Sequence, residues 1–74
     1  HQQKAIQDTM LGRELDVLEL VISGANNKAI AEQLALGLPT VKTHLQHIYH
    51  KAQVASRAEL LSQVINDLRA VEQI

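Results

Sequence analysis

The apolar residues of this chain recur at helical spacing, most clearly between residues 38 and 54. Val41, Leu45, Ile48 and Ala52 step by four, three and four residues, so they lie on one side of an α-helix. The chain contains a single aromatic residue and no cysteine. A core of aliphatic side chains between packed helices is therefore expected, without disulfides or thiolate-bound metal.

Capping signals divide the chain into four predicted helices. Gly24 provides a left-handed stop for the first helix, and Asn26 is a favourable N-cap for the second. Ser56 and Glu59 have the spacing of a capping box, in which the Ser accepts from the Glu N–H and the Glu carboxylate accepts from the Ser N–H. The predicted helices cover residues 9–23, 27–34, 38–54 and 57–72. They predict an all-α fold, a compact four-helix bundle that contains a helix-turn-helix.

Seventy-four residues are enough for one domain. We assign it to residues 8–74 and interpret residues 1–7 as a flexible N-terminal end or a remnant left by cloning. Because the chain begins with His1 and not with Met, we expect it to be part of a longer protein with an upstream regulatory domain. No apolar run approaches the roughly 20 residues that span a bilayer, so no membrane partner is expected. The predicted location is the bacterial cytoplasm, with the nucleoid.

The distribution of charge indicates a partner, although the formal net charge is only -1. No Asp or Glu lies between Glu32 and Glu59, and this window contains two lysines, one arginine and three histidines. A surface without carboxylates is favourable for approaching a phosphate backbone. The pattern therefore favours double-stranded DNA as the partner, and a solvated polar helix face is the alternative.

The side of the third helix opposite its apolar stripe is the predicted DNA-reading face. A polar helix of this kind fits the major groove, where a lysine can donate to guanine and a glutamine can pair with adenine. The residues expected to contact bases are Lys42, Thr43, Gln46 and His47. The residues expected to contact phosphates are Asn27, Lys28, Thr40, His50 and Lys51. Of these, Asn27 and Lys28 open the second helix, where free N–H groups favour an anion.

The sequence resembles the LuxR/GerE/FixJ-type helix-turn-helix domain, the DNA-binding output module of many bacterial transcription regulators. The resemblance covers about residues 10–65. It is carried by Arg13-Glu14, Val17-Leu18, Gly24, Asn27-Lys28, Ile30-Ala31, Leu34, Thr40-Val41-Lys42, His44, Ile48, Lys51, Val54, Arg57 and Glu59. It implies that the third helix reads DNA and that Glu14 and Lys51 lie close enough for an ion pair. It also implies the C-terminal output domain of a response or quorum regulator, with RNA polymerase as a candidate further partner.

The fourth predicted helix has more apolar surface than one packed face requires. Its aliphatic residues span a wider arc than the roughly 100° of a single stripe. We therefore expect Leu61, Ile65 and Leu68 to form a homodimer interface, although an entirely intramolecular core is the alternative. A dimer would bind an imperfect inverted repeat with half-sites about one helical turn apart.

Other functions find little support in the residues. His44, His47 and His50 step by three, but no Cys or nearby carboxylate completes a metal site, so no metal and no cofactor are predicted. No nucleophile–base set or glycine-rich phosphate loop is present, so no catalytic residues are predicted and the protein is not expected to be an enzyme. His44 is expected to be packed and hydrogen-bonded, whereas Arg13 and Arg57 are interpreted as surface or supporting residues.

A second hypothesis is a protein-interaction module that keeps this fold but has lost its affinity for DNA. It is favoured by the net charge of -1 and by two departures from the family pattern, Ala29 and Gln46. Relatives more often carry Glu at the first position, and Lys or Arg at the second.

Overall fold

The structure, a computed structural model, describes residues 12–72. They form four helices, α1 (Arg13–Ile22), α2 (Asn27–Leu34), α3 (Leu38–Ala52) and α4 (Arg57–Glu72). The predicted all-α fold class is confirmed. Residues 1–7, interpreted above as an N-terminal end or a remnant, lie outside the described residues. None of the described helices has the length and hydropathy to cross a membrane.

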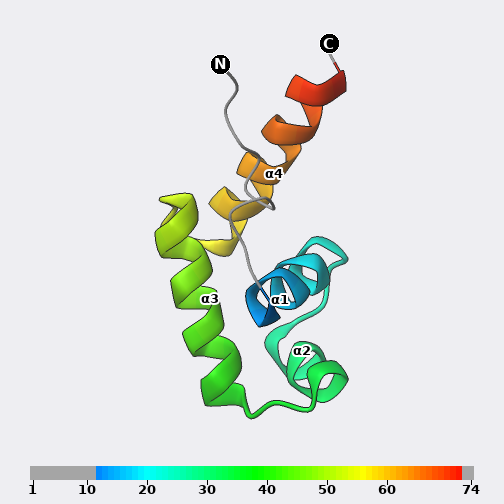
Figure 1. Cartoon of the computed structure of the whole chain (residues 1–74), viewed down its shortest axis with the longest axis vertical. Coiled ribbons are helices and arrows are strands. Elements are labelled where there is room, and N and C mark those ends of the chain that lie inside the picture. Colours follow the sequence, from blue (N-terminus) through cyan, green and yellow to red (C-terminus); the bar gives the residue numbers. More distant parts are fainter. Residues whose placement is uncertain (1–11, 73–74) are drawn as a thin grey trace.

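The core lies where α3 packs against the other three helices. Figure 1 shows α1 and α2 on one side of α3, while α4 continues away from them. Val41, Leu45 and Ile48 of α3 are buried, as their spacing predicts, and Ala52 is half-buried. The other buried aliphatic residues are Val17, Leu18 and Val21 of α1, Ile30 and Ala31 of α2, and Leu60 and Val64 of α4. Because three helices hold α3 on its apolar side, its opposite side is left uncovered by the described part of the chain.

The first helix begins later than its sequence pattern predicts. Gly12 is the N-cap residue and has a φ of 56°, a left-handed conformation that interrupts any helix running through it. The predicted start at residue 9 is therefore wrong for α1. A favourable charge arrangement takes the place of a side-chain cap, because Glu14 and Asp16 lie in the first turn near the positive end of the helix dipole.

The connection from α1 to α2 follows the predicted capping chemistry. Gly24 has a φ of 97°, and its N–H donates to the Val21 carbonyl at 3.0 Å. The next N–H, that of Ala25, donates to the Leu20 carbonyl at 3.0 Å, which completes a Schellman motif. The Asn26 side chain then accepts from the Ala29 N–H at 2.8 Å and starts α2 as predicted.

The turn between α2 and α3 is short because α2 ends in a single left-handed residue. Ala35 has a φ of 55° and ψ of 43°, and the following N–H, that of Leu36, donates back to the Ala31 carbonyl at 2.9 Å. Gly37 then precedes α3 with extended backbone angles, and Pro39 lies in the first turn, where its missing N–H has no intrahelical partner. This turn directs α3 across the end of α2.

One of the two hydrogen bonds of the capping box before α4 differs from the prediction. The Ser56 hydroxyl accepts from the Glu59 N–H at 3.2 Å, as predicted. The Glu59 carboxylate, however, accepts from the Ala55 N–H at 2.6 Å and not from that of Ser56. The side chain reaches one residue further back, so the cap also fixes the loop that leads into α4.

Candidate nucleic-acid interface

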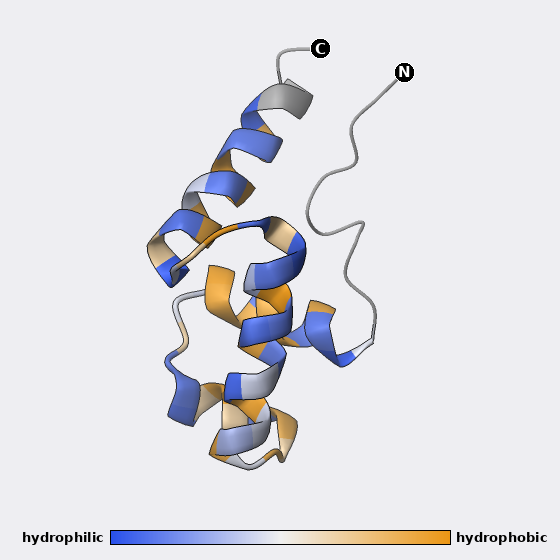
Figure 2. Ribbon diagram, turned by 90° about the vertical axis from the view of Figure 1, so that its left-hand side faces the viewer, coloured by the Kyte–Doolittle hydropathy of each residue, from blue (hydrophilic) through white to orange (hydrophobic). Residues whose placement is uncertain are grey.

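The outward side of α3 is polar and open to solvent. Figure 2 shows it in blue and pale colours, facing the viewer. All four residues predicted to contact bases, Lys42, Thr43, Gln46 and His47, are exposed. Of the predicted phosphate contacts on this helix, Thr40, His50 and Lys51 are exposed as well. The helix is therefore free to approach a large partner along its whole outward side.

Thr43 is the one base-facing candidate whose side chain forms a hydrogen bond within α3. Its hydroxyl donates to the Pro39 carbonyl at 3.0 Å. This bond fixes the rotamer, and it leaves the oxygen as an acceptor and the methyl group as an apolar contact for a thymine methyl.

One carboxylate enters the polar face from another helix. Glu14 of α1 accepts from Lys51 Nζ at 2.6 Å, and its second oxygen lies 3.8 Å from His47 Nδ1. The ion pair expected between Glu14 and Lys51 is confirmed. The Glu14 side chain is only 15% exposed, so the pair is partly shielded from solvent. The acid-poor window in the sequence does not produce a carboxylate-free surface, because Glu14 arrives from a distant part of the chain.

Arg57 connects the start of α4 to the start of α2. Its Nη1 donates to the Ala25 carbonyl at 3.0 Å, and its Nη2 donates to Asn27 Oδ1. The residue is half-buried and bonded to two other residues, so it takes the supporting role, one of the two interpretations made from the sequence. The contact between Arg57 and Asn27 joins residues 30 positions apart, so no local pattern in the sequence predicts it.

The predicted phosphate contacts on α2 lie beside an open hollow. Lys28 is exposed, whereas Asn27 is half-buried under Arg57. The hollow is lined by Gly24, Ala25, Asn26, Asn27, Lys28, Leu38, Lys42 and Arg57. Lys42 therefore lies at the border between the outward face of α3 and this hollow.

The three histidines of α3 differ in their surroundings. His47 and His50 are exposed, whereas His44 is half-buried with a buried Nδ1 that has no hydrogen-bond partner among the described residues. The expectation that His44 is packed is met, but the expected hydrogen bond is absent at this nitrogen. Within residues 12–72, no group of three His, Cys, Asp or Glu is placed to hold a metal ion.

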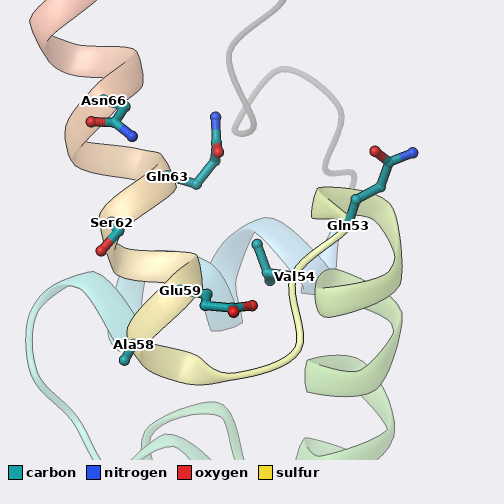
Figure 3. A pocket seen from close by; sticks show the side chains of 7 residues that line it. All are labelled: Gln53, Val54, Ala58, Glu59, Ser62, Gln63 and Asn66. Carbon is teal, nitrogen blue, oxygen red and sulfur yellow. The ribbon is translucent and has the colours of Figure 1, made fainter.

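A second hollow lies between α4 and the loop before it. Figure 3 shows Glu59 pointing from α4 toward the loop segment that carries Val54, while the Gln63 side chain turns upward on the same side of α4. The lining residues are Gln53, Val54, Ala58, Glu59, Ser62, Gln63 and Asn66. Since the Glu59 carboxylate is bonded to the Ala55 N–H, this hollow belongs to the junction between α3 and α4.

The family described as bacterial regulatory proteins, luxR family, matches residues 10–64 of the chain. The chain belongs to this family. The family is one of transcription regulators and not a class of enzymes, and the four helices are its DNA-binding helix-turn-helix domain. The resemblance found in the sequence is thereby confirmed.

Similar curated proteins are also named as regulators. "Putative HTH-type transcriptional regulator in exeN 3'region" of Aeromonas salmonicida is 43% identical over 61 residues, which are 82% of this chain and 31% of that protein. "Monoamine regulon transcriptional regulator" of Klebsiella aerogenes is 45% identical over 53 residues, 72% of this chain and 23% of that protein. "HTH-type transcriptional regulator MalT" of Serratia proteamaculans is 45% identical over 51 residues, 69% of this chain and 6% of that protein.

The chain thus spans less than a third of the length of each of these relatives. No solved structure matches it significantly.

Proposed function

We propose that this chain is the C-terminal output domain of a bacterial transcription regulator and that α3 binds in the major groove of DNA. The observation that carries the proposal is the outward side of α3, which is exposed along its length and offers hydrogen-bonding side chains. An α-helix fits the major groove, and the N-terminal part of a recognition helix reaches base edges. The family and the names of the relatives support this assignment.

The proposed contacts follow from the position of each side chain on α3. Thr43, Gln46 and His47 face outward and are assigned to base edges, as in the sequence prediction. Lys42 lies at the border of that face and is long enough to reach either a guanine edge or a phosphate. Thr40, His50 and Lys51 are assigned to phosphates, together with Asn27 and Lys28 of α2. Lys51 shares its charge with Glu14, so its contribution is expected to be smaller than that of Lys28.

The exposed side of α4 is the proposed dimer interface. Ile65 is 49% exposed and Leu68 is 53% exposed, while Leu61 is half-buried against the core. Two such domains would bind an imperfect inverted repeat, with half-sites about one helical turn apart. RNA polymerase is the proposed further partner, and the bacterial cytoplasm, at the nucleoid, is the proposed location.

The experiment that tests the proposal is a selection of bound duplexes from a random pool, followed by a salt titration of the enriched sequence. Specific binding should enrich one motif, and the dissociation constant should rise steeply with salt, with a log–log slope near 0.9 per neutralised phosphate. Absence of any enriched motif would contradict the proposal.

A protein-interaction module is the second candidate function. It is favoured by the ion pair of Glu14 with Lys51, which removes positive charge from the face that must meet DNA, and by the net charge of -1. This candidate predicts that the chain binds no duplex more tightly than an unrelated acidic polymer at the same salt concentration.

A further inference from the structure

The hollow between the starts of α2, α3 and α4 gathers positive charge from three different helices. Lys28 comes from α2, Lys42 from α3 and Arg57 from α4, and all three line it. Its other lining residues are uncharged, so no carboxylate lies in its wall. Three cations in one concave place repel one another unless an anion or solvent lies between them. The hollow is therefore a favourable place for a negatively charged group.

The two lysines are available for such a group. Both are exposed, and within residues 12–72 neither forms an ion pair, in contrast to Lys51 with its Glu14 partner. Arg57 is held differently, because two of its N–H groups bond to Ala25 and Asn27. A guanidinium has five N–H donors, so further donors remain on a group whose position is fixed.

Arg57 also sets the orientation of the neighbouring amide. Because Asn27 Oδ1 accepts from Arg57, the Asn27 amide nitrogen points away from the guanidinium and keeps its own donors. The first intrahelical backbone bond of α2 runs from the Ile30 N–H to the Asn26 carbonyl, and the Ala29 N–H is capped by the Asn26 side chain. The backbone N–H groups of Asn27 and Lys28 precede both bonds, at the end of the helix where N–H groups have no intrahelical partner. Donors from both side chain and backbone thus border the same hollow as the cations.

We propose that this hollow is a phosphate site that holds one backbone phosphodiester of the DNA, with Lys28 and Lys42 as its mobile cations and Arg57 as its fixed one. The proposal rests on the proposed function and deepens it. It assigns Lys42 to the backbone and leaves base recognition to the centre of α3. It also gives Arg57 a role in binding, because the same guanidinium that anchors α4 faces the phosphate.

The first test is the salt dependence of binding to a duplex selected from a random pool. Lys28→Ala and Lys42→Ala should each lower the log–log salt slope by about 0.9 per bound subunit. When the salt concentration is raised from 50 to 200 mM, the factor by which affinity falls should be about 3.5-fold smaller for each variant than for the unmodified chain. Arg69→Ala removes an equal charge from an exposed position far along α4 and is the control that should leave the slope unchanged.

Arg57→Gln belongs in the same series, with thermal unfolding measured in parallel. Its bonds to Ala25 and Asn27 also support the fold, so a lower slope counts only if the variant unfolds at a similar temperature. The two lysine variants have exposed side chains and keep the test independent of folding.

The second test replaces single phosphates of the duplex by neutral methylphosphonates. At one position the methylphosphonate should lower the affinity of the unmodified chain. The same methylphosphonate should lower the affinity of Lys28→Ala and of Lys42→Ala only slightly, because the lysine substitution and the methylphosphonate remove the same interaction. A parallel arm adds inorganic phosphate to the free protein at matched ionic strength. If inorganic phosphate shifts the amide resonances of Asn27 and Lys28 while no methylphosphonate position couples to the lysines, the hollow binds a free anion and the proposal is overturned.

The outcomes separate this proposal from the function on which it rests. If the unmodified chain has a steep salt slope and the two lysine variants have the same slope as Arg69→Ala, the phosphate site is overturned and DNA binding is left intact. A Lys42→Ala variant with an unchanged slope but a relaxed preference at one base overturns the assignment of Lys42 to the backbone. If the unmodified chain binds no duplex in a salt-dependent way, the proposed function itself fails.

Discussion

Gln46 lies at the centre of the exposed side of α3, one turn after Thr43. A glutamine can form two hydrogen bonds with adenine in the major groove, and such a pair contributes about 1–3 kcal/mol to discrimination between bases. The side chain is exposed and takes no part in the core, so its loss should affect recognition and not folding.

Gln46→Ala is therefore expected to relax the preference at one base pair of the selected motif by about 1–3 kcal/mol, with no change in the unfolding temperature. Repeating the duplex selection with the variant measures this. Gln33→Ala removes the same side chain from an exposed position on α2 and is the matched control. A Gln46→Ala variant that selects the same motif with the same stringency would show that Gln46 does not read a base.

The two exposed histidines of α3 are expected to make DNA binding sensitive to pH. Histidine side chains change charge between about pH 5 and 8. His47 and His50 are exposed on the proposed DNA-facing side, and each gains a positive charge on protonation. The groups around His47 are Glu14 of α1 and Lys51 one turn further along α3.

We expect affinity for DNA at fixed salt to increase as the pH falls from 8 to 6, because the complex then takes up protons near phosphates. Replacing both His47 and His50 by Gln should flatten the curve, and fluorescence anisotropy across this pH range measures it. A flat curve for the unmodified chain would refute this expectation.

At the scale of the helices, the glycines at the end of α1 and the start of α3 have opposite expected effects on stability when they are replaced. Gly24 ends α1 with a φ of 97°, and a Cβ placed there meets no atom within 4 Å. The cost of a substitution is therefore backbone strain alone. Gly37 has an ordinary φ of -77° at the N-cap of α3, where Ser is preferred slightly over Gly.

Gly24→Ala should destabilise the fold by about 1–2 kcal/mol, whereas Gly37→Ser should stabilise it by about a few tenths of a kcal/mol. Urea unfolding followed by circular dichroism compares the two glycine variants directly. Equal stability of Gly24→Ala and the unmodified chain would show that this turn relaxes to another conformation.

The elements predicted from sequence are those fixed by short-range patterns. The stripe of Val41, Leu45 and Ile48 follows from helical periodicity, and Asn26 caps α2 through a bond within its own turn. The start of α1 was mispredicted because apolar periodicity continues across Gly12, whose left-handed φ breaks the helix.

The features that periodicity and spacing could not supply are set by tertiary packing. Glu14 reaches Lys51 across 37 positions, and Arg57 reaches Asn27 across 30. Only the family resemblance indicated the first of these contacts. The contact between Arg57 and Asn27 brings the starts of α4 and α2 together. Because no sequence pattern indicates it, the sequence predicts the candidate site as a set of exposed residues and not as a hollow lined by three helices.

At the scale of the whole molecule, α4 carries the two most exposed large aliphatic side chains among the residues whose burial the structure describes. Leu60 and Val64 are buried in the core, while Ile65 and Leu68 are about half exposed. A contiguous apolar patch can mark an interaction surface, so these two side chains are the residues to change in a test of the proposed dimer.

The Ile65→Glu and Leu68→Glu double variant should remain folded but fail to dimerise, because its core residues are unchanged and like charges meet across the two-fold axis. Sedimentation with the selected inverted repeat should then show one bound subunit for each half-site, without cooperativity. Ser62→Glu with Asn66→Glu adds the same charge to exposed positions at the hollow of Figure 3 and should leave assembly unchanged. Cooperative binding by the double variant would place the dimer contact elsewhere.

The central claim is that the outward side of α3 lies against DNA. The most direct measurement is a titration of the isotope-labelled chain with the selected duplex, following each backbone amide by NMR. We predict that the largest shifts fall on residues 40–50 of α3 and on Asn27 and Lys28, and that they diminish as salt is raised. Shifts confined to α4 and the hollow of Figure 3, with α3 unaffected, would contradict the account.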